Sequence, residues 1–196
     1  TVRLEGNNHI VNKVRGWDDS RLTLAADSTG NLKVERGIHI AHNVILTIAG
    51  GRIETTAVGY AAGIGCSGKN EDPAGPGTVV RITGGYVWAY HIEPNPIASG
   101  IGGGFRKWSP VIHISGGTVR ADGWSDIGRP RDGTANQVMF TGGSIIGMRS
   151  NSVVPAPTNA AGEAVHCLTL TGLAPSNAVV FAGLPEEYGT NDIEAD

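Results

Sequence analysis

The fold is decided by one phrase that the chain repeats: LTIAGG at 46–51, VRITGG at 80–85, IHISGG at 112–117 and VMFTGG at 138–143. The four copies start 34, 32 and 26 residues apart, and a shortened fifth, LTLTG at 168–172, starts 30 residues after the fourth. Each copy alternates apolar and polar residues before its glycines, which is typical of a short β-strand that ends at a turn. Repetition at this length indicates a solenoid in which each repeat forms one coil.

Two further landmarks follow each phrase. A second alternating run comes after the glycine pair, such as RIE at 52–54 and YVW at 86–88, and then GIG at 63–65, GIG at 100–102 or DIG at 126–128. The repeats lack the 3.6-residue apolar period of a helix. A unit this short cannot bury its apolar side alone, whereas units stacked about 4.8 Å apart bury it together. We therefore predict an all-β fold with very little helix, a single-stranded parallel β-helix of about five to seven coils.

The alternation assigns the inward side chains to rows, meaning residues at equal positions of successive coils. The glycine pair is expected to turn the chain between sheets, because glycine adopts positive φ without a Cβ clash. An antiparallel β-sandwich is the alternative, and it would instead show spaced hairpins with Asn-Gly or Asp-Gly turns. The predicted core rows are Leu46, Val80, Ile112 and Val138; Ile48, Ile82, Ile114 and Phe140; Ile53, Val87, Val119 and Ile145; and Ile64, Ile101 and Ile127.

The whole chain, 1–196, is expected to form one domain. Its parts are shorter coils or a cap at 1–45, regular repeats at 46–172, and a C-terminal cap or tail at 173–196. The chain begins with Thr rather than Met and opens without a basic or apolar leader, so we expect a processed or excised piece. Cys66 and Cys167 should be unpaired, because about three coils, roughly 14 Å, separate them.

Composition excludes several classes of partner. The chain has 40% hydrophobic and 17% charged residues, which favours a folded protein over a disordered one. Its formal net charge is −3 and its pI is about 6.0, so nucleic acid is not an expected partner. Its apolar runs fall short of the ~20 residues of a membrane-spanning helix, so membrane insertion is not expected either.

The segments IHISGGTVRADG at 112–123 and ASGIGGG at 98–104 carry a family resemblance. The chain over about 44–150 resembles the Gly-rich right-handed β-helix modules of bacterial cell-surface proteins, of carbohydrate-binding-domain type and with a pectate-lyase-like superfold. The resemblance implies a right-handed coil and a secreted, extracellular or cell-surface location. The lyases of this superfold use calcium-binding acids and an Arg or Lys base, but no such motif matches here. No catalytic residue, metal site or cofactor is therefore assigned, with calcium the one ion left open.

The outward positions of the second run predict a binding surface. Tyr86, Trp88 and Tyr90 fall on one coil, and Glu54 lies on the coil before. Aromatic planes with flanking hydrogen-bonding groups suit the apolar face and the hydroxyls of a sugar ring, so the expected partner is a polysaccharide or glycan. The alternative is that the rings pack beneath the 90–99 segment. The remaining predicted site residues are Arg120 and Asp122 on the coil after, and Trp108 and Trp124 in turns near the rim.

Two other functions stay open beside this non-catalytic binding module. A polysaccharide lyase or glycoside hydrolase could use the acidic side chains of Asp122, Asp126 and Asp132, since glycosidases need two carboxylates at close range. A solvated group of ion pairs is the alternative interpretation of these residues. A structural subunit or spacer of a surface fibre would instead associate with itself through its coil ends.

Overall fold

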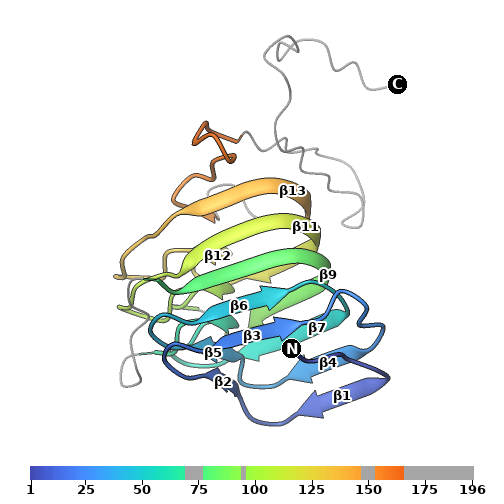
Figure 1. Cartoon of the computed structure of the whole chain (residues 1–196). Helices are drawn as coiled ribbons and strands as arrows, with labels where there is room; N and C mark the ends of the chain where they lie inside the picture. The colour runs from blue at the N-terminus through green and yellow to red at the C-terminus, as the bar shows by residue number, and fades with distance from the viewer. Residues whose placement is uncertain (69–76, 94–95, 147–152, 166–196) are drawn as a thin grey trace, which may run out of the picture.

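The computed structural model describes residues 1–68, 77–93, 96–146 and 153–165 (Figure 1). Within these ranges the regular secondary structure is β-strand alone, as the alternation predicts. In the same ranges there is no helix of the length and apolarity that crossing a membrane requires. The predicted fifth copy at 168–172, the tail at 173–196 and Cys167 lie outside the described residues.

The described residues contain fourteen strands, and most of these are short. The strands are β1 (Asn7–Ile10), β2 (Val14–Gly16), β3 (Arg21–Leu24), β4 (Asn31–Val34), β5 (Ile38–Ile40), β6 (Ile45–Ile48), β7 (Arg52–Ala57), β8 (Ile64–Gly65), β9 (Val79–His91), β10 (Ile101–Gly102), β11 (Val111–Asp122), β12 (Ile127–Gly128), β13 (Val138–Ile146) and β14 (Val153–Val154).

The strands form two sheets, and every pair of them is parallel. The larger sheet has eight strands in the order β1-β4-β7-β9-β11-β13, with β3 and β6 also paired in it. The smaller sheet has six strands in the order β14-β12-β10-β8-β5-β2. Neighbouring strands in each sheet come from successive repeats, so the arrangement fits a parallel β-solenoid and contradicts the antiparallel sandwich (Figure 1).

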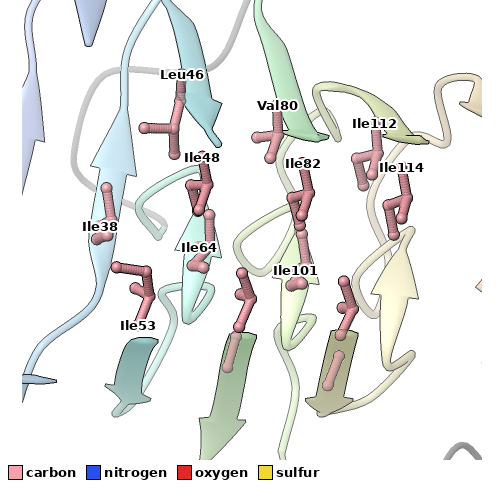
Figure 2. Packing of buried hydrophobic residues seen from close by; sticks show 14 of the residues in the cluster. Ile38, Leu46, Ile48, Ile53, Ile64, Val80, Ile82, Ile101, Ile112 and Ile114 are labelled. Atoms are coloured by element: carbon pink, nitrogen blue, oxygen red, sulfur yellow. The ribbon is translucent and has the colours of Figure 1, made fainter. Parts of the chain in front are cut away.

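The predicted rows are confirmed by the strand register. Ile48 pairs with Ile82, Ile82 with Ile114, and Ile114 with Phe140. In the smaller sheet Ile64 pairs with Ile101. All fifteen predicted core residues are buried, each with at most 3% of its surface exposed. Figure 2 shows side chains of equal position stacked coil upon coil, so each apolar residue packs on one of similar shape.

Residues 1–45, which the sequence predicts as shorter coils, contribute β1 to β5. Leu22 and Leu24 of β3 pair with Leu46 and Ile48, and Leu32 of β4 pairs with Ile53. The core rows therefore begin well before the first clear copy of the repeated phrase.

The glycine pair does not lie between two sheets, as the sequence predicted, but within one sheet. The second glycine of each pair has positive φ, as expected: the angle is 79° at Gly51, 78° at Gly85 and 77° at Gly117. However, the segments on either side of the pair belong to one sheet, and β9, β11 and β13 run through it without a break. The register shifts there instead, so the pair forms a β-bulge that bends a strand rather than a corner between two sheets.

The first glycine of each pair is required for a different reason, which the sequence alone did not indicate. A Cβ on Gly116 would overlap the carbonyl oxygen of Thr83 on the neighbouring coil, and a Cβ on Gly142 would lie 2.6 Å from that of Ser115. The bulges of adjacent coils therefore approach so closely that only a hydrogen fits between them.

This geometry predicts that Gly117→Ala destabilises the fold much more than Gly59→Ala. Both residues have positive φ, 77° and 64°, but only at Gly117 would the new Cβ meet a neighbouring carbonyl, that of Gly85 at 2.6 Å. We expect Gly59→Ala to lower the free energy of unfolding by about 1–2 kcal/mol and Gly117→Ala by about 4 kcal/mol or more. Chemical denaturation measures both values, and equal losses would contradict the close approach.

Candidate functional site

The outward side chains of the larger sheet form rows of their own, which we call the sheet-face surface. They alternate with residues such as Ile53, Val87 and Val119, which point inward and are fully buried. The register defines three outer rows, which are Asn7, Asn31, Arg52, Tyr86, Thr118 and Ser144; His9, Lys33, Glu54, Trp88, Arg120 and Ile146; and Thr56, Tyr90 and Asp122.

Two aromatic rings lie together at the centre of this surface. The ring centroids of Trp88 and Tyr90 are 4.6 Å apart, with their planes inclined by 30°. The Cζ of Arg120, which is paired with Trp88 in the sheet, lies 4.8 Å from the centroid of the indole. Both rings are half-buried. Trp88 therefore has one neighbouring ring and one guanidinium to fix its orientation, and it still reaches solvent.

Side chains of the preceding coil, on β7, form the other side of the sheet-face surface. The Cζ of Arg52 lies 4.4 Å from the ring centroid of its sheet neighbour, Tyr86. The hydroxyl of Tyr90 donates a hydrogen bond to Oε1 of Glu54 at 3.3 Å, which joins adjacent coils. Glu54, the three aromatic residues and Arg120 therefore lie next to one another on three successive coils, and glycan binding by them stays a prediction.

The surface continues toward the N-terminus into an open hollow of about 350 Å³. Asn31 Nδ2 donates to Asn7 Oδ1 at 2.7 Å along its edge, and His9 Nε2 lies 2.8 Å from Glu35 Oε1. Apart from Glu54, the residues of this hollow lie outside the binding surface that the sequence predicts. The hollow is lined by Asn7, Asn8, His9, Asn31, Leu32, Lys33, Arg52 and Glu54.

A sequence signal for the hollow exists in the run NLKV at 31–34, which has the same alternation as RIET at 52–55. The two runs pair residue for residue in the structure. Because the phrase with the glycine pair is missing from the first coils, only this weaker alternation marks them.

The two predicted rim residues occupy turns rather than the sheet. Trp108 is 51% exposed and forms an isolated parallel bridge with Thr134. Trp124 is 52% exposed, two residues after Asp122, and the Cζ of Arg131 lies 5.4 Å from its ring centroid. Trp108 and Trp124 therefore lie outside the three rows of the sheet-face surface, and a part in glycan binding stays a prediction for both.

The three aspartates considered for catalysis occupy different environments. Asp122 is half-buried at the end of β11, whereas Asp126 is only 2% exposed and accepts a hydrogen bond from the Gly123 amide at 3.3 Å. Asp132 is exposed and lies 4.0 Å from Arg106 Nε. Among the described residues, no three His, Cys, Asp or Glu side chains are grouped closely enough to hold a metal ion.

Comparison with protein-family models, with curated proteins and with solved structures found no significant match.

A double-mutant cycle tests whether Arg120 fixes Trp88. We expect Arg120→Gln and Trp88→Leu to be coupled by about 0.5–1 kcal/mol in the free energy of unfolding, because a guanidinium over an indole is attracted to its π face. Arg81→Gln on the same strand as Trp88 is the matched control, since Arg81 pairs with Thr47 and His113 in the register rather than with an aromatic residue. If the two substitutions lower the free energy of unfolding additively, the contact between Arg120 and Trp88 contributes nothing to stability.

Proposed function

We propose that the chain is a single right-handed parallel β-helix of about five to seven coils that binds a polysaccharide through the sheet-face surface, without catalysis. The observation that carries the proposal is the register, which sets Tyr86, Trp88 and Tyr90 between Glu54 on one coil and Arg120 and Asp122 on the other. The coil number is supported by the six strands of the smaller sheet, each contributed by a successive repeat.

The chemistry of this surface suits a sugar ring. The face of a pyranose carries C–H groups that pack on an indole or phenol ring, while its hydroxyls need donors and acceptors at the ring edge. Trp88 and Tyr90 offer the aromatic faces, and the Glu54 carboxylate and Arg120 guanidinium lie beside them. The asparagines of the hollow extend the same hydrogen-bonding capacity by two coils.

The shape of the surface favours a polymer over a small molecule. Small ligands are usually enclosed in a concave pocket, whereas these rows lie on the outer face of a sheet and the hollow at their end is open. Each row advances about 4.8 Å per coil, so an extended glycan lying along the rows would meet a new set of side chains at each coil.

The environments of the aspartates favour binding over hydrolysis or lyase chemistry. Asp126 is buried and accepts a hydrogen bond from a backbone amide, whereas Asp132 is exposed beside Arg106, so these two carboxyls have different surroundings. On the resemblance of the repeats, we also propose a place among the Gly-rich modules of bacterial cell-surface proteins, outside the cell.

A glycan array followed by calorimetric titration tests the binding proposal. We expect Trp88→Ala to weaken binding of the selected glycan by a factor of about ten or more, because stacking on an aromatic ring contributes on the order of 1–2 kcal/mol. Trp17→Ala is the matched control, since Trp17 is 63% exposed and has Arg15 over its ring on another part of the surface.

If Trp88→Ala leaves both the affinity for the glycan and the melting temperature unchanged, the sheet-face surface is not the binding site. Release of reducing sugar or of an unsaturated product from the bound polysaccharide would show that the chain is an enzyme rather than a non-catalytic binding module.

A second candidate function, assembly through a coil end, is favoured by one observation. A hollow of about 540 Å³ opens at the N-terminal coil, and most of its lining is apolar, including Ile10, Val14, Leu22 and Leu24. Among the described strands, β1 pairs with β4 alone, so its other edge has free backbone groups. An open apolar end with an unpaired strand edge is a template for another strand.

Sedimentation velocity over a range of concentrations tests this assembly. We expect a shift to larger species that Ile10→Asp abolishes, because a carboxylate at the rim of the apolar hollow would lose its water on association. Val11→Asp is the control, since Val11 is 67% exposed and does not line the hollow. A single monomeric species at every concentration would contradict the proposal.

A further inference from the structure

A second set of aromatic and cationic side chains lies away from the rows of the larger sheet. We call it the turn strip, defined by Tyr60, Phe105, Arg106, Trp124 and Arg131, all in turns that enter or leave the strands of the smaller sheet. Tyr60 and Phe105 are stacked, with centroids 5.4 Å apart and planes inclined by 29°. The Cζ of Arg106 lies 4.9 Å from the centroid of Phe105.

The strip continues to the next coil. The Arg106 amide donates a hydrogen bond to the carbonyl of Arg131 at 3.2 Å, and the Phe105 amide donates to the carbonyl of Tyr60 at 2.8 Å. The Arg131 guanidinium in turn lies over Trp124, 5.4 Å from its centroid. Because β8, β10 and β12 are consecutive neighbours in their sheet, the aromatic rings and guanidinium groups of the strip come from three successive coils.

The strip is open to solvent. Tyr60 is 48% exposed and Trp124 is 52% exposed, and the side chain of Arg106 is 58% exposed. With the half-buried Phe105, these rings come from three successive coils, whereas single exposed apolar residues are the ordinary case on a surface without a partner.

The strip is also cationic in an acidic chain. Segments 105–108 and 124–132 contain four basic side chains, Arg106, Lys107, Arg129 and Arg131, against two acids, the buried Asp126 and the exposed Asp132, whereas the whole chain has a formal net charge of −3. A local excess of positive charge in a chain of the opposite sign marks a surface that is complementary to an anion.

We propose that the turn strip binds an acidic polysaccharide, whose sugar rings pack against the exposed aromatic residues while their carboxylates pair with Arg106 and Arg131. A guanidinium binds a carboxylate through two parallel hydrogen bonds, and stacking on a ring fixes its plane beforehand. The ion pair of Arg106 with Asp132, Nε to Oδ2 at 4.0 Å between exposed groups, contributes little stability and is readily replaced by a ligand carboxylate.

Single-stranded nucleic acid is the competing polyanion, and the strip favours it less. Nucleic-acid surfaces stack bases on open aromatic faces along a strongly basic groove. Here Phe105 and Trp124 each already have a guanidinium over the ring, and the chain as a whole is acidic. One face of each ring is thus next to a cation, and the guanidinium offers paired N–H donors to a carboxylate, which a sugar acid has and a base lacks.

Affinity electrophoresis of the full chain in gels containing alginate, polygalacturonate or hyaluronate tests the proposal. We expect at least one polymer to retard the chain, retardation to fall with added salt, and the same polymer with esterified carboxyls to have no effect. Arg131→Gln and Trp124→Ala should each raise the dissociation constant about tenfold or more, while Arg15→Gln leaves it unchanged. Arg15 is the matched control because its Cζ also lies over an exposed tryptophan, 4.0 Å from the centroid of Trp17.

Four outcomes would overturn the proposal: no retardation by any of the acidic polymers, equal retardation by the esterified form, tighter binding to an oligodeoxythymidylate of matched charge, or unchanged binding in Arg131→Gln and Trp124→Ala. Circular dichroism of each variant checks that the fold is intact. The tests of the turn strip and of the sheet-face surface change different residues, so either proposal can fail while the other stands.

Discussion

The structure depends on parallel backbone pairing between successive repeats, in which each coil supplies the hydrogen-bond partners of the next. A short strand such as β8 or β10 has only two residues, and its amides and carbonyls find partners on the adjacent coil rather than within its own repeat. This pairing requires close approach of the backbones, which explains the glycines at the bulges: at Gly116 and Gly142 the neighbouring carbonyl occupies the space of a side chain. One constraint thus sets the repeat, its glycines and its apolar rows together.

The same register that buries the core also arranges the outer face. Once Val87 lies over Ile53, the flanking Trp88 must lie beside Glu54 and Arg120, because successive side chains of a strand point to opposite faces. The candidate binding residues are therefore held by sheet backbone on three coils rather than by flexible loops. A ligand that binds there meets side chains whose positions are already fixed, which reduces the entropy lost on binding.

The sequence predicted those parts of the molecule that follow from repetition. The core rows and the neighbours of Trp88 were predictable because residues at equal positions in a repeated phrase become neighbours in space. The bulge at the glycine pair was not, since alternation and glycine content fit a corner equally well. The turn strip was also missed: Tyr60, Phe105 and Arg131 come from turns that differ in length and sequence, so no common position in the repeat brings them together.

The unequal length of the repeats has an architectural consequence. Ile38, Ile64, Ile101 and Ile127 stack in one row although the chain between them spans 26, 37 and 26 residues. The register of the row is the same across spans of different length, and buried apolar residues line the interior on both sides of the longest one. Such a scaffold can acquire or lose surface segments one coil at a time without repacking its interior, and so each turn is free to diversify independently of the others.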